Sequence, residues 1–418
     1  MKSFTLTALL LFLVAPSLAQ PLSLRDALKT TAENNPTLKA AYAQVKAADA
    51  DVRQAGILQN PNLDARIVWL QGTGRSLQEY GISYNIIDLF QRGSRVSISR
   101  SRRDATLMKT LRRAVEIEAE VKKAYVTVQG HTQGLREQKV LLEISEIDAE
   151  LAERQKKAGN IAALQLAERK AALLQTRTLY YNREMALFEA RQELAKLMGQ
   201  ADKMASITVV AGPPDLPRES HKTSPMLVAE ALLKRKDLTA QRMEAKALEK
   251  DRRQQNLLIF DGTSLGYAYE KEPDGARLQG VSISMPLPIF DRKQAQKQKL
   301  EALIEKQNAQ QAELSQEITS DINMLLVKMA NARLRVEQLE ELVPLREEIL
   351  ELSRQQYNAM LIGAYQLLDF RGQGSVALLT LADAKADFWR AHADLEGALG
   401  RSLLESKSPF KTQTKDNS

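Results

Sequence analysis

Four short segments of the chain alternate apolar and polar residues with a period of two. They cover residues 62–70, 78–87, 263–270 and 278–287. Alternation of this kind predicts β-strands with one apolar face, and each segment has about the length of a tilted transmembrane strand. The apolar positions are Leu63, Ala65, Ile67 and Trp69 in the first, Tyr80, Ile82, Tyr84 and Ile86 in the second, Leu265, Tyr267 and Tyr269 in the third, and Val281, Ile283 and Met285 in the fourth.

Two polar loops join these segments in pairs. Residues 71–76 contain two glycines, and residues 271–275 contain Pro273 and Gly275. Glycine and proline favour turns, so the four strands are predicted to form two hairpins.

The rest of the chain is predicted to be long helices. No proline lies between Pro61 and Pro213, and the stretch is rich in Ala, Leu, Glu, Lys, Arg and Gln. Residues 92–158 alone would form a helix about 100 Å long. The other predicted helical segments are 23–57, with Asn35-Pro36 as a helix start, 161–198, 226–255, 292–358 and 364–402.

The two halves of the chain resemble each other at an offset of about 200 residues. Ile161-Ala162-Ala163-Leu164-Gln165-Leu166 matches Ile362-Gly363-Ala364-Tyr365-Gln366-Leu367, and Gly81-Ile82-Ser83-Tyr84 matches Gly280-Val281-Ser282-Ile283. We interpret the chain as a tandem duplication. The predicted organisation is a signal peptide over residues 1–19, a first repeat over 20–199, a linker over 200–225, a second repeat over 226–405 and a disordered polar tail over 406–418.

The N-terminus predicts export. Lys2 precedes an apolar run from Phe4 to Ala15, and small residues precede a cleavage point after Ala19. The run has about 12 residues, fewer than the roughly 20 of a helical membrane anchor. Cleavage before Gln20 is therefore favoured over an anchor.

Composition excludes several classes of function. The chain of 418 residues has a net charge of +7, but its basic and acidic residues are interspersed without a nucleic-acid-binding motif, so no nucleic-acid partner is expected. The absence of Cys excludes disulfides, thiolate metal sites, Cys nucleophiles and a lipidated N-terminal Cys. His131, His221 and His392 are widely separated, so we expect no metal site and no cofactor. No catalytic constellation is present, and an enzyme is not expected.

The strands could lie in one of two environments: a half-buried soluble sheet packed on the helices, or a membrane. Tyr and Trp gather in these strands as they do at membrane interfaces, which favours the membrane. Four strands cannot close a barrel, and open edges do not survive in hydrocarbon. Two chains would supply eight strands, whose interior is filled by side chains, and three would supply twelve with a lumen. Membrane strands therefore predict a trimer, with lipid-facing residues Leu63, Ile67, Trp69, Tyr80, Ile82, Tyr84, Tyr267, Tyr269, Val281 and Ile283.

Three sequences resemble the outer-membrane efflux proteins, the TolC-like family of Gram-negative bacteria. They are Leu24 to Ala41 (LRDALKTTAENNPTLKAA), Asn60-Pro61-Asn62-Leu63, and Val281 to Gln294 (VSISMPLPIFDRKQ). The last is similar to a segment of the heavy-metal efflux (CzcC/CusC-like) branch, with Ala295 where that branch often has Gly. The resemblance covers essentially the whole chain after residue 19.

The resemblance implies a mainly α fold with a small β part. Long helical hairpins would form an α-helical barrel through the periplasm in a homotrimer, and four strands per chain would contribute to a 12-stranded outer-membrane β-barrel in contact with lipid. It also implies a periplasmic adaptor (membrane fusion protein) and an inner-membrane pump, of which the RND type is one candidate. The function expected is a passive exit duct of a tripartite efflux system for heavy-metal cations.

The turns between the long helices are candidate docking sites, because apolar residues stand where a solvated turn is normally polar. The turn residues are Gly159, Asn160, Ile161 and Ala162 at the first turn, and Leu361, Ile362, Gly363 and Ala364 at the second. In the resembling channels such tips meet the adaptor; simple helix-turn chemistry is the alternative. Asp369 and Arg371 are the periplasmic gate candidates, with ordinary solvated charges as the alternative.

Other functions stay open. A soluble periplasmic coiled-coil structural or adaptor protein would bury Leu63, Ile67, Trp69, Ile82 and Tyr267 in protein, whereas a duct would place them in lipid. Drugs and secreted polypeptides are alternative substrates, because similar ducts conduct them.

Overall fold

The computed structural model describes residues 21–401 except positions 70, 73, 211 and 219–222. The predicted signal peptide (1–19), the polar tail (406–418) and His221 lie outside the described residues. The first half contains α1 (Leu24–Asn34), α2 (Pro36–Ala55), β1 (Asn62–Trp69), β2 (Ser76–Asn85), α3 (Ile86–Lys157) and α4 (Ala163–Leu197). A 3-10 turn, η1 (Ala201–Ser206), follows. The second half contains α5 (Ser224–Lys234), α6 (Lys236–Leu258), β3 (Ser264–Lys271), β4 (Arg277–Ser284), α7 (Gln294–Asn358) and α8 (Ala364–Leu399).

The order of elements is therefore the same in the two predicted repeats. The described residues nevertheless form two compact units that each combine segments of both halves. One, here called the tip unit, comprises residues 21–33, Ala124–Pro214 and Leu339–Ala386, and it contains both turns between long helices. The other, the sheet unit, comprises Asn34–Lys123, Asp215–Gln338 and residues 387–401, and it contains all four strands.

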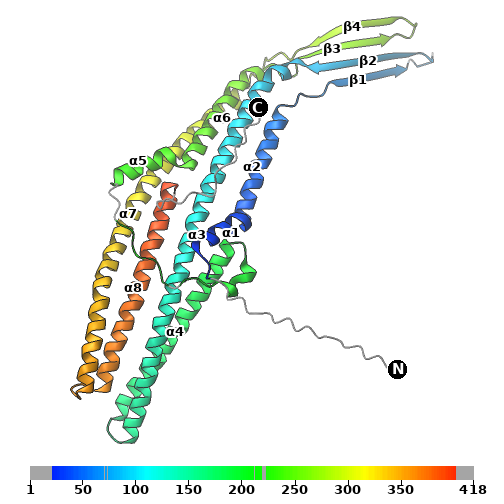
Figure 1. Cartoon of the computed structure of the whole chain (residues 1–418). Coiled ribbons are helices and arrows are strands. Elements are labelled where there is room, and N and C mark those ends of the chain that lie inside the picture. Colours follow the sequence, from blue (N-terminus) through cyan, green and yellow to red (C-terminus); the bar gives the residue numbers. More distant parts are fainter. Residues whose placement is uncertain (1–20, 70, 73, 211, 219–222, 402–418) are drawn as a thin grey trace, which may run out of the picture. The chain divides into compact units, whose positions relative to one another are not determined.

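The four strands form one antiparallel sheet in the order β1-β2-β3-β4 (Figure 1). Its register places Leu63, Ile82, Tyr267 and Val281 opposite one another in a single row across all four strands. Because side chains alternate between faces along a strand, this register puts every predicted lipid-facing residue on one face of the sheet.

The predicted helix before each pair of strands is divided in two. Asn35 separates α1 from α2, and its side chain accepts a hydrogen bond from Leu38 N at 3.1 Å. In the second half Arg235, in an extended conformation, separates α5 from α6. The predicted helix start at Asn35-Pro36 is confirmed, because Asn35 is the N-cap of α2. The prediction of one continuous helix over 23–57 and over 226–255 was wrong; no Gly or Pro marks the break at Arg235.

The break at Arg235 is held by buried polar contacts in the sheet unit. Arg235 is buried, and its guanidinium donates to Asp237 and, at 3.1 Å, to the carbonyl of Ala398. Arg112 donates to the neighbouring carbonyl of Gly397 at 2.6 Å. Both arginines therefore donate to carbonyls in the last turn of α8, where the helix offers few backbone donors; the carbonyl of Gly397 also accepts from Gly400 N at 3.2 Å.

An apolar core packs beside these contacts. It joins α5, α6, α7 and the end of α8 through Leu227, Ala231, Leu238, Ile318, Ile322, Leu325, Leu395, Ala398 and Leu399. Burial of this surface is the main force that holds the helices of the sheet unit together.

The tip unit contains a close helix contact. A Cβ on Gly130 of α3 would lie 2.9 Å from the Cβ of Ala386 in α8, so only glycine permits this approach. One turn further on, Arg183 of α4 lies over Gly134 and forms a two-pronged ion pair with Asp383, with distances of 2.7 and 3.1 Å.

The first part of the predicted linker packs on α3 within the tip unit. Val209 forms a parallel bridge with Leu22, and Gln129 Nε2 donates to Val210 O at 3.2 Å. Tyr125 donates its hydroxyl to Leu22 O at 2.8 Å. The segment after α4 thus packs as part of the tip unit.

Candidate functional site

The apolar face of the sheet is open in this chain. Leu63 is 80% exposed, Trp69 72%, Val281 72% and Ile283 74%. No helix of the described chain covers them, so the interpretation as a soluble sheet packed on its own helices is not supported. Tyr84 and Tyr269 are partly buried, and the hydroxyl of Tyr84 donates to Asp88 Oδ2 at 3.3 Å.

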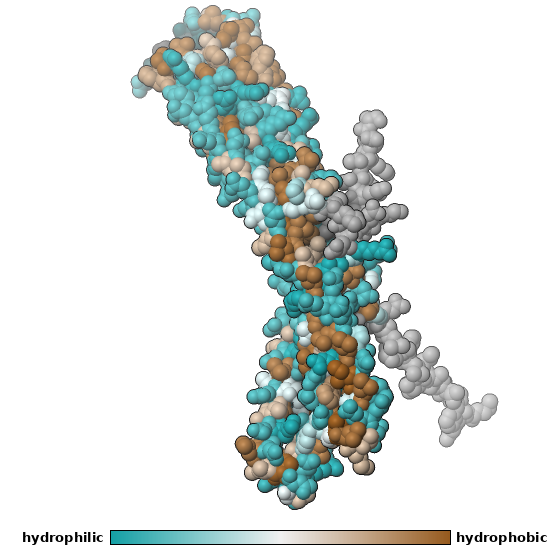
Figure 2. Space-filling model, turned by 90° about the vertical axis from the view of Figure 1, so that its left-hand side faces the viewer, coloured by the Kyte–Doolittle hydropathy of each residue, from teal (hydrophilic) through white to brown (hydrophobic). Residues whose placement is uncertain are grey.

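The opposite face of the sheet is mainly polar, with Val68, Leu77 and Leu278 as exceptions. Its residues include Asn62 and Asp64 in β1, Ser83 in β2, Ser264 in β3 and Ser282 in β4. In the view of Figure 2, apolar residues lie beside polar ones at the height of the sheet in Figure 1. The sheet therefore has two chemically distinct faces, one suited to hydrocarbon and one to water.

Both turns between long helices end in the same helix cap. At the end of α3, Asn160 N donates to Gln155 O at 2.9 Å and Gly159 N donates to Lys156 O at 3.1 Å. At the end of α7, Leu361 N donates to Gln356 O and Met360 N donates to Tyr357 O, each at 2.9 Å. This pattern of hydrogen bonds is the Schellman motif, which requires a residue with positive φ.

The residue with positive φ is Gly159 in the first turn and Met360 in the second. Their φ angles are +76° and +59°. Met360 is also 93% exposed, so an apolar side chain is held in solvent by a backbone conformation that favours glycine. Met360 was not among the predicted turn residues, although the offset of 201 residues that aligns the turns also aligns it with Gly159.

Exchanging these two residues should move stability in opposite directions. Met360→Gly should raise the free energy of unfolding by up to about 1 kcal/mol, because glycine adopts positive φ without strain. Gly159→Met, which places a side chain in open space at the equivalent position, should lower the free energy of unfolding. Chemical denaturation of both variants measures the difference. A loss of stability in Met360→Gly would mean that the Met360 side chain makes a stabilising contact.

The predicted docking residues surround these caps. Gly159, Asn160, Ala162, Leu361 and Gly363 are exposed. Ile161, Ile362 and Ala364 are partly buried, and Leu361 is 74% exposed. Both turns belong to the tip unit. The two turns, together with Met360, present apolar side chains to solvent.

A set of polar contacts lies between the long helices near the turns. Tyr365, the second residue of α8, donates its hydroxyl to Gln155 Oε1 of α3 at 3.0 Å. The guanidinium of Arg169 of α4 lies 4.7 Å from the centre of the Tyr365 ring. Arg169 also forms an ion pair with Asp148 at 3.0 Å. These contacts join α3, α4 and α8 close to their turns.

Asp369, the first gate candidate, lies on α8 and is exposed. Its carboxylate accepts a hydrogen bond from Gln373 Nε2 at 2.8 Å. Burial raises the pKa of Asp148 on α3, and the negative charge of Asp369 adds to this, whereas Arg169 opposes it. Asp148 is therefore close enough to Asp369 for the two carboxylates to repel each other. The sequence analysis did not identify Asp148.

The second gate candidate, Arg371, is also exposed but is not paired with Asp369. Among the described residues, no ion pair joins the two. Residues two positions apart on a helix point to different sides, which explains the separation. Asp369 and Arg371 therefore face different surroundings.

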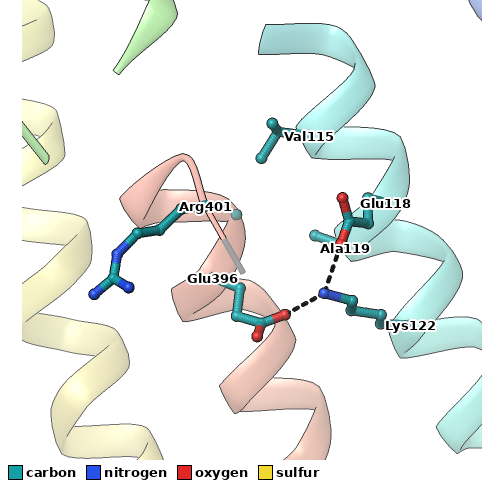
Figure 3. Close-up of a pocket in the computed structure, with 7 residues that line it drawn as sticks. Val115, Glu118, Ala119, Lys122, Glu396 and Arg401 are labelled. Carbon is teal, nitrogen blue, oxygen red and sulfur yellow. Dashed lines mark hydrogen bonds and ion pairs between the residues drawn. The ribbon is translucent and has the colours of Figure 1, made fainter. Parts of the chain in front are cut away.

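A small polar cavity lies between α3 and α8 in the sheet unit (Figure 3). Lys122 projects towards it and binds Glu118 at 2.8 Å and Glu396 at 2.6 Å. The cavity has about 20 Å³, enough for one water molecule. Burial alone would lower the pKa of Lys122, but the two carboxylates raise it. The group therefore holds two helices together and has no room for a substrate.

His392 is buried one turn from Glu396 in the same region. Its ring lies 5.1 Å from the ring of Trp389, and its Nδ1 is 3.9 Å from Glu396 Oε1. Burial lowers the pKa of His392; Glu396 opposes this, and Lys122 adds to it. The folded protein therefore favours the neutral imidazole.

This burial predicts a loss of stability in mild acid. Above about pH 6.5 His392 is neutral in both states and contributes no pH dependence. Below that pH the unfolded chain takes up a proton that the folded chain does not, so the free energy of unfolding falls by about 1.4 kcal/mol for each unit by which the pKa is lowered. The melting temperature should fall between pH 7.5 and pH 5, and this fall should be smaller in His392→Gln than in the unchanged protein. An equal fall in both would exclude His392 as the cause.

Two kinds of feature are absent from the described residues: groups of metal-binding side chains and helical membrane spans. No group of three or more His, Asp or Glu side chains is placed to hold a metal ion. No helix in the described ranges combines the length and the apolar character of a membrane span.

Comparison with known proteins matches part of the chain to a family. Residues 27–200 match the family model described as outer membrane efflux protein. The matched region begins in α1 and ends just after α4, so it includes β1, β2 and the turn between α3 and α4.

Relatives of the efflux family resemble the chain over most of its length. The cobalt-zinc-cadmium resistance protein CzcC of Cupriavidus metallidurans is 26% identical over 399 residues, which are 92% of this chain and 88% of CzcC. A membrane protein from Pseudomonas aeruginosa has a TM-score of 0.75 at 21% identity and covers 93% of this chain and 92% of its own. CusC has a TM-score of 0.70 at 16% identity and covers 91% and 92%. The predicted TolC-like fold is confirmed.

Proposed function

We propose that this protein is the outer-membrane exit duct of a tripartite efflux system. One observation carries the proposal most strongly: the ten predicted lipid-facing residues lie on a single face of the sheet, most of them exposed, in a chain whose residues 27–200 match the efflux family. In the membrane that face contacts hydrocarbon, and the polar face lines a water-filled passage.

The open edges of the sheet support assembly of several copies. β1 and β4 each have one unpaired edge in a single chain. Unpaired edge groups are too costly in hydrocarbon, so the edges pair with those of neighbouring copies. Three copies supply twelve strands, enough for a barrel with a lumen, and their helices continue the passage through the periplasm.

Heavy-metal cations are the proposed substrate. This rests on the similarity to CzcC, which is a cobalt-zinc-cadmium resistance protein, and on the VSISMPLPIFDRKQ segment. The duct conducts passively. The energy comes from an inner-membrane pump of the RND type, linked by a periplasmic adaptor that docks on the turns at residues 159–162 and 361–364. Drugs and secreted polypeptides are the alternative substrates.

Membrane fractionation with unheated gel electrophoresis and crosslinking tests the proposal. We expect a detergent-requiring trimer in the outer membrane, and loss of tolerance to cobalt, zinc or cadmium when the gene is deleted. A soluble monomer or dimer in the periplasm would contradict the duct and favour a coiled-coil adaptor. A trimer with unchanged metal tolerance would retain the duct and change its substrate.

Asp369 is the proposed gate residue. Three copies around an axis bring three Asp369 carboxylates, each near an Asp148, into the passage. In planar bilayers, Asp369→Ala should therefore raise single-channel conductance. Glu168→Ala, which removes an exposed carboxylate of α4, is the control and should leave conductance unchanged. Unchanged conductance in both would remove Asp369 as the gate, and Arg371→Ala would then test the second candidate.

A further inference from the structure

Charge on the apolar face of the sheet is confined to one place. In the four strands that the structure describes, the side chains on that face are apolar, aromatic, hydroxyl or amide, except for Lys271 in β3 and Arg277 in β4. Both of these side chains are exposed. The efflux function proposed above uses neither of them.

Strand pairing places the two cations directly opposite each other. Lys271 and Arg277 are partners in the register of β3 and β4, so their Cβ atoms are about 5 Å apart. Hydrogen bonds fix the turn that joins them: Glu272 N donates to Ala276 O at 2.9 Å, and Ala276 N donates to Asp274 Oδ1 at 2.9 Å. The turn therefore holds the two backbone positions at a fixed spacing.

Neither cation is neutralised within the described part of the chain. No carboxylate there forms an ion pair with Lys271 or Arg277. Like charges directly opposite each other on a sheet are destabilising. On the polar face the described strands carry one basic residue, Arg66, and it lies opposite Glu79 in the register. The pair on the apolar face is therefore open to an anion from outside the chain, whereas the charge of Arg66 is matched by its neighbour.

The pair lies at the end of the sheet that is farthest from the helices (Figure 1). Lys271 is six positions beyond Leu265 on the same face, about 20 Å along the strand, and positions 267 and 269 between them carry no charge. Gln78 of β2 lies in the same row beside Lys271. Its side-chain amide donates one hydrogen to Ser76 Oγ at 3.2 Å, which leaves the other for a ligand. In the proposed duct the helices are periplasmic, so this row lies in the outer leaflet.

We infer that Lys271 and Arg277 bind a phosphate group on the sugar headgroup of lipopolysaccharide, the phosphorylated glycolipid of the outer leaflet. Basic side chains at headgroup level attract anionic lipids, and a guanidinium binds phosphate through paired hydrogen bonds. A phosphate between the two side chains also offsets their repulsion. The site favours a lipid over a soluble anion, because the acyl chains of the lipid lie along the same apolar face. β3 is an inner strand, so edge pairing with another copy does not cover Lys271. The inference rests on the proposed outer-membrane location.

Titration of the delipidated trimer in detergent, followed by native mass spectrometry, tests the inference. Lys271→Gln and Arg277→Gln, singly and together, remove the two charges. Arg66→Gln is the matched control, because it removes a cation from the polar face of the same sheet. The probes are diphosphorylated lipid A, lipid A without phosphate groups, phosphatidylglycerol and inorganic phosphate. Unheated gels report whether each variant assembles, and the single variants decide the question if the double variant does not.

The expected result is one diphosphorylated lipid A per chain, with a Kd that rises about tenfold for each charge removed and stays the same in Arg66→Gln. Lipid A without phosphate groups and phosphatidylglycerol should bind about tenfold more weakly or worse, and equimolar inorganic phosphate should not compete. Unchanged affinity in the Lys271 and Arg277 variants, or an equal loss in Arg66→Gln, overturns the inference. Equal binding of phosphatidylglycerol, or competition by inorganic phosphate, means a general anion site and also overturns it. A trimer that ignores lipid A keeps the duct and rejects only the lipid site, whereas a monomer that needs no detergent rejects the duct itself.

Discussion

Val281→Arg should prevent assembly of the protein in the membrane, whereas Gly280→Arg, one residue earlier, should not. Val281 lies in the row that crosses all four strands on the apolar face, and Gly280 points to the polar face. Arginine at the middle of a lipid-facing strand costs about 2–4 kcal/mol, and a trimer would incur this cost three times. A Cβ at Gly280 meets no atom within 4 Å, so the control substitution has space.

The two variants separate lipid exposure from a general effect of added charge. Both add the same side chain to the same strand, and they differ only in the face. The measurement is the amount of trimer in the outer-membrane fraction on unheated gels. Equal insertion of both would refute the assignment of the apolar face to lipid. Equal loss of both would point to disturbed strand pairing, and the face would then be tested with Val281→Ser against Val281→Leu.

The strands were predictable because one physical constraint repeats in each of them. Alternation fixes which residues share a face, and the predicted ranges differ from the observed strands by at most a few residues. The errors lie at the ends. Ile86 continues the alternation of β2 but begins α3, because Asn85 Oδ1 accepts a hydrogen bond from Ile87 N at 3.1 Å and caps the helix. Alternation alone cannot show whether Ile86 is the last residue of a strand or the first residue of a helix.

Features that depend on distant residues were not predictable. The helix break at Arg235 exists because its guanidinium reaches the carbonyl of Ala398, 163 positions away in the chain. The proximity of Asp148 to Asp369 was recognised only when α3 and α8 were placed together. The composition of the turns pointed to them as candidate docking sites. It did not show that Met360 takes the positive φ that Gly159 takes in the first turn.

Gly363→Asp should abolish export while leaving the amount of trimer unchanged. Gly363 stands immediately before α8, and its carbonyl accepts a hydrogen bond from Leu367 N at 3.3 Å, which places it at the N-cap. Aspartate is among the most favourable N-cap residues, and a Cβ at Gly363 meets no atom within 4 Å. The substitution should therefore preserve or slightly stabilise the helix. What it changes is the surface: a charge replaces a small residue beside Leu361 and Met360.

The choice of Gly363 over Gly159 matters because the two glycines have different roles. Gly159 has a φ of +76°, so Gly159→Asp would strain the cap and could lower the yield of folded protein. Ala162→Asp, at the N-cap of α4, is the equivalent change at the first turn and should also abolish export. Thr223→Asp at the exposed N-cap of α5 is the matched control and should leave metal tolerance intact. Export that persists with a charge at both turns would mean that they do not dock an adaptor, and their apolar residues would then serve only the helix caps.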